Sequence, residues 1–92
     1  MKLRYYTTIS VECGDLEDIW DIEETLITRA KKYRGIDTGA GYGFGCRDVS
    51  FEFKTDKKRR QFIKTFSSKR LRVNRQSLKI SEIFVQEFAD DE

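Results

Sequence analysis

The sequence predicts a small α+β protein with a ferredoxin-like βαββαβ arrangement, in which a four-stranded antiparallel sheet carries two helices on one face. Three observations favour this fold. Residues 2–12 alternate along a strand, residues 15–34 repeat apolar side chains at helical spacing, and the strand-then-helix order returns after residue 48. The expected strand order is 4-1-3-2, with the first and third strands central and parallel, in a single domain spanning residues 1–92.

The first strand and the first helix follow from side-chain spacing. One face of the strand is expected to carry Leu3, Tyr5, Thr7, Ile9 and Val11. After Gly14, Asp15 can cap a helix whose apolar positions, Trp20 among them, keep helical spacing to a stop at Gly35, with a single lapse at Glu23. Acids occupy its first turns and bases its last, as the helix dipole favours.

A glycine-alternating stretch follows a loop expected at residues 36–38. Every odd position from 39 to 45 is glycine, so an extended chain would show bare backbone on one face and a partly aromatic ridge on the other, formed by Ala40, Tyr42, Phe44 and Cys46. Residues 49–53 alternate as the next strand. The two strands are expected to form a hairpin or bent pair that turns at Gly45 or at the Arg47-Asp48 step.

The second half of the chain contains a helix and a final strand. Thr55 or Asp56 can cap the helix, which is expected to end at residues 67–68 and to be followed by a basic connector. In the last strand, near residues 78–88, the apolar positions change parity between Ile80 and Ile83. This change indicates a bulge near Glu82 or two partly covered faces, and residues 89–92 are expected to fray.

Composition excludes several classes of function. The 92 residues contain no histidine and only two cysteines, which disfavours an enzyme, a metal site or a bound cofactor. Cys13 and Cys46 are expected to be reduced. Cys13 would lie at the end of one central strand and Cys46 near the start of its parallel neighbour, at opposite edges and too far apart to form a disulfide. No apolar run approaches 18 residues and the first residues lack a signal-peptide core, so we expect a cytoplasmic protein without a membrane partner.

Charge is distributed unevenly along the chain. Residues 54–79 hold eleven bases and one acid, a net charge of +10, whereas the whole chain carries +2. Residues 12–24 hold seven acids and no base. Either the basic segment binds phosphates, or the basic helix lies beside the acidic one with their N-termini adjacent. In the second case Lys58 or Arg59 would reach Asp18 or Asp21.

The leading hypothesis is a small non-enzymatic domain that binds an anionic partner, nucleic acid first among them, through residues 54–79. The candidate contacts are Lys57, Lys58, Arg60, Lys64, Lys69, Arg70, Arg72 and Arg75, with Tyr42 and Phe44 as stacking groups. Residues 41–44 resemble the centre of the RNP1 motif of RRM-type RNA-binding domains at four of its eight positions. The likeness ends at Ala40, Gly45 and Arg47, and the stretch does not lead directly into the second helix.

The alternative hypothesis is a protein-interaction or inhibitor-like module, self-association included. It would use the Gly-rich strand at residues 39–45 or the acidic helix at residues 15–24, with candidate contacts Glu17, Asp18, Asp21 and Glu24. The acids of this helix lack the glycine turn and terminal glutamate of a calcium loop.

Overall fold

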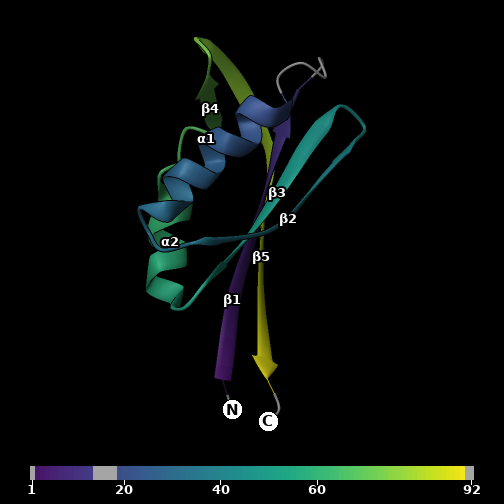
Figure 1. Cartoon of the computed structure of the whole chain (residues 1–92). Helices are drawn as coiled ribbons and strands as arrows, with labels where there is room; N and C mark the ends of the chain where they lie inside the picture. Colours follow the sequence, from purple (N-terminus) through teal and green to yellow (C-terminus); the bar gives the residue numbers. More distant parts are fainter. Residues whose placement is uncertain (1, 14–18, 91–92) are drawn as a thin grey trace.

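A computed structural model describes the backbone of residues 2–13 and 19–90 and the side chains of residues 3–13 and 19–89. Its elements follow one another along the chain (Figure 1) as β1 (Lys2–Glu12), α1 (Ile19–Lys31), β2 (Ile36–Gly43), β3 (Cys46–Phe53), α2 (Asp56–Lys64), β4 (Arg70–Val73) and β5 (Gln76–Asp90). The residues expected to fray at 89 and 90 therefore belong to a strand, and the loop expected at residues 36–38 belongs to β2.

The strands form a single antiparallel sheet in the order β2-β3-β1-β5-β4. The predicted four-stranded ferredoxin-like arrangement is therefore wrong, because residues 70–73, expected as a connector, add a fifth strand at one edge. β1 and β3 are neighbours but antiparallel, with Ile9 opposite Val49, whereas parallel strands were expected. β5 pairs with the other side of β1 over nearly its whole length.

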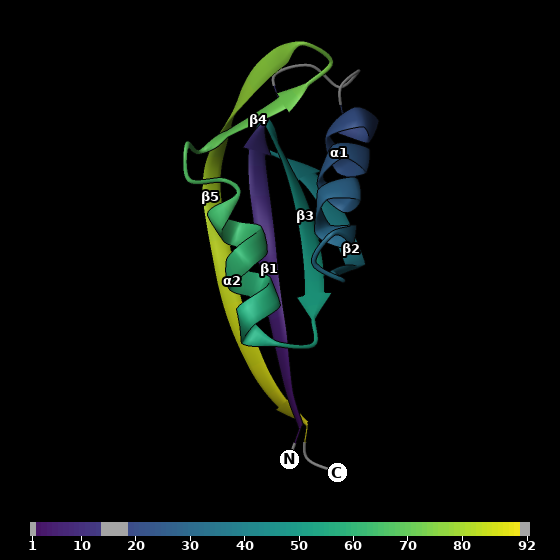
Figure 2. The ribbon, with the colours of Figure 1, turned by 90° about the vertical axis from the view of Figure 1, so that its left-hand side faces the viewer.

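Both helices cover the same face of this sheet (Figure 2). α1 packs against β2 and β3, and α2 packs against β1 and β3. The helices follow strands of opposite direction, so α2 runs opposite to α1. Their N-termini consequently lie at opposite ends of the layer, which overturns the expected adjacency of their first turns.

The core lies between the sheet and the helices. Phe62 of α2 is fully buried, and its ring centroid lies 5.3 Å from those of Phe51 and Phe53 and 5.1 Å from that of Phe66. The remaining buried apolar side chains come from α1, from four strands and from Cys13 just after β1: Ile9, Val11, Cys13, Ile22, Leu26, Ala30, Val49, Leu71, Val73 and Ile80. Burying side chains of this size contributes about 1.5–3 kcal/mol each.

Two irregularities of the sheet confirm sequence predictions. The β2–β3 hairpin turns through Phe44 and Gly45, whose φ angles are 54° and 75°, and a turn with two such residues matches the twist of the strands. In β5, Ile80 lies opposite Val11 while Glu82 lies opposite Ser10, so one residue bulges between them. The bulge keeps Ile80 and Ile83 on the helix-covered face.

The helix boundaries are set by local contacts. The Gly35 amide donates a hydrogen bond to the Ala30 carbonyl at 2.9 Å, and the preceding residue, Arg34, has a φ angle of 61°. The helical conformation of α1 therefore ends before Gly35, as the sequence predicts. A Cβ on Gly35 would lie 2.7 Å from the Phe53 ring, which leaves no room for another residue. The predicted cap at Asp15 lies outside the described residues.

Candidate nucleic-acid interface

Helix α2 starts with a side-chain cap. Thr55 is extended, with φ −132° and ψ 149°, and its hydroxyl accepts a hydrogen bond from the Lys58 amide at 3.2 Å. The bases of the first turn oppose the helix dipole, and Asp56 offsets them by pairing with Arg59 at 2.7 Å and with Arg60 at 3.1 Å. The compensating acid therefore comes from α2 itself.

Arg59 is a structural residue. Its side chain is buried and donates to the carbonyl oxygens of Tyr6 at 3.4 Å and Gln86 at 2.9 Å, which tie α2 to the two longest strands. It also pairs with Asp56 and with Glu87 at 2.9 Å. The expected pairing with Asp21 is wrong, and Asp18 lies outside the described residues.

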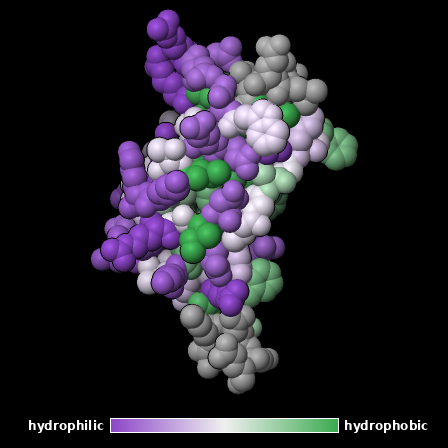
Figure 3. All heavy atoms as spheres, viewed as in Figure 1, coloured by the Kyte–Doolittle hydropathy of each residue, from purple (hydrophilic) through white to green (hydrophobic). Residues whose placement is uncertain are grey.

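The outer side of α2 forms a basic groove with the end of α1. The groove has a volume of about 400 Å³ and is lined by Lys32, Tyr33, Lys58, Gln61, Lys64 and Thr65. A second hollow of about 380 Å³ extends along α2 and is lined by Lys57, Arg60, Gln61 and Lys64. We call these two hollows together the interhelical basic groove. Figure 3 shows hydrophilic side chains gathered on this side of the molecule.

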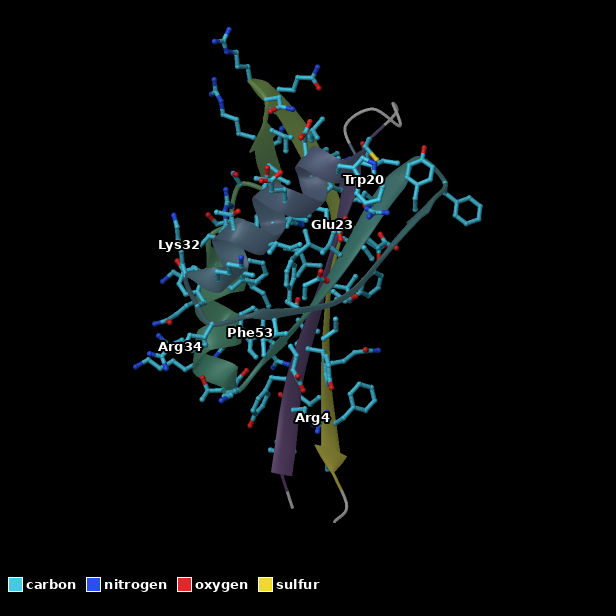
Figure 4. All side chains as sticks on the ribbon, in the orientation of Figure 1. Arg4, Trp20, Glu23, Lys32, Arg34 and Phe53 are labelled. Atoms are coloured by element: carbon cyan, nitrogen blue, oxygen red, sulfur yellow. The ribbon has the colours of Figure 1, made fainter. Side chains whose placement is uncertain are left out.

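The cations of this groove are poorly compensated. Among the cations that line the groove, Arg60 alone has an acid within 4.0 Å in residues 3–13 and 19–89. Lys32 lies in the turn directly after α1, and Figure 4 shows it on the α2 side of the molecule. The opposed directions of the helices thus bring bases of α1 to bases of α2, where the sequence predicted acids against bases. Like charges held together favour an anionic ligand between them.

The other predicted bases lie outside this groove. Lys69 lines a separate hollow beside the β5 bulge, with Ile80 and Glu82. Leu71 and Val73 are buried, so Arg70 and Arg72 point to the opposite, helix-free face.

The β4–β5 turn adds one more cation. Arg75 occupies this turn at φ 69°. Arg70 donates to the Ser77 carbonyl at 2.7 Å, and Arg72 and Arg75 have no acid within 4.0 Å in the described part of the chain. The hairpin is therefore a second cationic region.

The predicted stacking residues lie at the far edge of the sheet from β4. Tyr42 is opposite Arg47, whose side chain contacts α1, so Tyr42 belongs to the helix-covered face, and Phe44 is fully exposed at the hairpin turn. Neither lies on the helix-free face or beside the interhelical basic groove. The helix-free face carries instead Tyr6, Phe84 and Phe88, and sequence reasoning selected neither Phe84 nor Phe88.

The acidic candidates are only partly placed. Asp21 and Glu24 line a hollow of about 390 Å³ with Thr25, Thr28 and Asn74, and the Asn74 amide donates to Asp21. Glu17 and Asp18 lie outside the described residues. The lapse at Glu23 has a structural cause, because its carboxylate pairs with the buried Arg47 at 2.8 Å, and the Arg47 guanidinium in turn lies over the Trp20 ring.

Cys13 and Cys46 form no disulfide with each other. Cys13 is buried. Its backbone amide donates a hydrogen bond to the Gly45 carbonyl at 2.8 Å, so the backbone of Cys13 lies close to that of Cys46 in space. The predicted separation at opposite edges is wrong because β1 and β3 are antiparallel, but the two side chains occupy opposite faces of the sheet. Within the described ranges no group of three potential metal ligands comes together, and neither α1 nor α2 has the length and apolar character to cross a membrane.

Comparison with protein-family models, curated proteins and solved structures finds no match to this chain.

Proposed function

We propose that this protein is a non-enzymatic nucleic-acid-binding protein whose interhelical basic groove contacts the phosphate backbone. The observation that supports this proposal is the meeting of Lys32, which directly follows α1, with Lys58 and Lys64 of α2 in one hollow that no described acid lines. Cations in such a groove gain affinity by releasing counterions from phosphates, whatever the base sequence. We also infer a cytoplasmic location, which the absence of a disulfide between Cys13 and Cys46 supports.

The arginines of the β4–β5 hairpin are a second contact in this proposal. Arg72 and Arg75 lie at the end of the sheet, separated from the groove by the hollow that Asp21 and Glu24 line. A ligand that contacts both regions must span the hollow that lies between them. Short oligonucleotides should therefore depend on the groove alone.

The protein-interaction alternative has less support on its acidic side. The Asp21 carboxylate already accepts a hydrogen bond from Asn74, and the Glu23 carboxylate already forms an ion pair with Arg47. Of the three acids of α1, Glu24 alone has neither an ion pair nor a hydrogen bond from a side chain among the described residues.

Binding to short labelled single- and double-stranded RNA and DNA tests the proposal. Affinity should fall steeply between about 50 and 200 mM salt. Lys32→Ala, Lys58→Ala and Lys64→Ala should each weaken binding to all sequences alike and reduce the slope of log affinity against log salt by about one. Lys79→Ala is the matched control, since it removes the same charge from β5 on the helix-free face, near Glu12.

Each outcome decides a part of the proposal. No binding even at low salt would reject the function. Binding that survives the three groove substitutions but is lost in Arg72→Ala and Arg75→Ala would move the site to the hairpin. Equal losses in the groove variants and in Lys79→Ala would mean that net charge, not the groove, attracts the nucleic acid.

A further inference from the structure

The β2 edge of the sheet is open. All eight residues from Ile36 to Gly43 are exposed, and β2 is the outermost strand, so one row of its backbone amides and carbonyls faces away from β3. Asp37 is the one charged residue of the strand. Proteins protect such edges with charges, with short strands or with a covering element. In β2, Asp37 and the register shift between Asp37 and Gly39 stand at its first residues, and residues 40–43 carry neither a charge nor a bulge.

The opposite edge of the sheet is protected by the same criteria. β4 has four residues, and its outward side chains Arg70 and Arg72 are cationic. Charge and shortness both discourage a further strand from pairing there. The two edges therefore differ in the feature that decides whether a sheet can extend.

The glycines of β2 remove a further obstacle. A Cβ built on Gly39, Gly41 or Gly43 would meet no atom within 4 Å, so these positions face open space on the helix-free side. No side chain from them can obstruct a neighbouring strand. This is the bare backbone face that the alternation in the sequence predicted.

Helix α1 presents a stripe of side chains toward the same edge. Trp20, Glu24, Ile27 and Lys31 are spaced by four, three and four residues and share one side of the helix. Trp20 is 73% exposed and lies 5.6 Å from the Arg47 guanidinium, which is opposite Tyr42 of β2. Figure 4 shows Trp20 beside the β2–β3 hairpin.

The stripe is self-complementary under a twofold axis. Glu24 and Lys31 are both exposed, lie two turns apart and form no ion pair among the described residues. When two such helices lie antiparallel, the acid of each faces the base of the other, and Ile27 lies near the centre. Charge complementarity therefore favours a second copy of this chain over a foreign partner.

We propose that two copies associate through antiparallel pairing of β2 with β2. The pairing joins two five-stranded sheets into one continuous sheet and sets the two α1 helices antiparallel on the same face. Glu24 of one copy then faces the partner's Lys31, and this contact occurs twice.

Sedimentation equilibrium over a range of concentrations measures the association. The monomer mass is 10.9 kDa, and the dimer should have twice that mass. Glu24→Lys and Lys31→Glu should each weaken dimerisation about tenfold or more, because each places two like-charged pairs in the interface. An equimolar mixture of the two variants should dimerise again, because every contact then joins opposite charges. Loss of folding could not produce this recovery.

Two further variants locate the surface. Lys32→Glu changes a charge just after α1, on the side that faces α2, and should leave the dimer unchanged while it weakens nucleic-acid binding. Ala40→Lys places a charge in β2 and should weaken the dimer while every residue of α1 is kept. A monomer at every concentration up to about 1 mM would overturn the proposal. A dimer unaffected by Ala40→Lys would overturn the strand pairing, and one that does not recover in the mixture would overturn the helix contact.

Discussion

The two sides of α2 use the same kind of residue for different purposes. Arg59 and Arg60 are adjacent, yet Arg59 is 4% exposed and bonded to two strand carbonyls and two acids, whereas Arg60 is exposed and touches Asp56. On the inner side the cation joins the helix to β1 and β5. On the outer side the cations line the interhelical basic groove. A run of bases can therefore contain both a structural residue and residues that contact a ligand. The burial of each side chain distinguishes the two roles, whereas the sequence composition does not.

The inner side of α2 should be the most sensitive to substitution. Phe62→Ala removes a fully buried ring that packs on Phe51, Phe53 and Phe66, and it should lower the free energy of unfolding by about 3–5 kcal/mol. Urea denaturation measures the loss. Phe44→Ala is the matched control on an exposed ring and should change stability by less than about 0.5 kcal/mol. Equal effects of the two substitutions would contradict the assignment of the core.

Arg59→Ala should have the next largest effect, a loss of about 2–3 kcal/mol in unfolding free energy. The substitution leaves the Tyr6 and Gln86 carbonyls without their charged donor, while Asp56 and Glu87 are partly exposed and recover solvent. Thermal or urea unfolding tests this. Arg60→Ala should lie within about 0.5 kcal/mol of the wild type. If the two arginines behaved alike, the contrast between the two sides of α2 would not hold.

The N-cap lies between the two sides and should have an intermediate effect. Thr55→Ala removes the acceptor of the Lys58 amide and should cost about 1 kcal/mol of stability. Thr55→Ser keeps a hydroxyl and should recover most of this loss, which the same unfolding experiment measures. A Thr55→Ser variant as unstable as Thr55→Ala would show that the methyl group, not the cap, matters.

The smallest stability effects are expected in the groove. Lys58→Ala and Lys64→Ala should each change the unfolding free energy by less than about 0.5 kcal/mol, because both residues lack an acid partner in the described chain. Their nucleic-acid affinity should nevertheless fall. A variant that loses stability and affinity together would indicate that its lysine supports the fold instead of contacting the ligand.

Most of the elements could be predicted from the sequence because their signals are local. The alternation of residues 2–12, the cap at Thr55, the turn at Gly45 and the parity change before Ile83 all correspond to observed features. The fifth strand could not be recognised, because residues 70–73 give only two apolar positions, Leu71 and Val73, within a run of bases. Four residues are too few for a periodic pattern to separate a strand from a connector.

The candidate site depended on a global feature that no local pattern carries. The sequence indicated which segments are basic, but the direction of β3 relative to β1 decides whether α2 meets the acidic or the basic end of α1. The parallel arrangement predicted for these strands placed acids against bases. The antiparallel arrangement brings Lys32 to Lys58 instead. Lys32 was thus missed as a site residue, since its position near the end of a helix was already explained by the dipole.

The pairing of β1 with β5 has a consequence for how the chain assembles during translation. β1 is the middle strand and the earliest to be synthesised, whereas β5 is the latest of the elements (Figure 1). A ribosome-bound chain can complete the β1, α1, β2 and β3 portion, but one flank of β1 stays vacant until residues 76–90 leave the exit tunnel. Contacts this remote in sequence slow folding, so the nascent chain spends its longest unprotected interval with its central strand half covered.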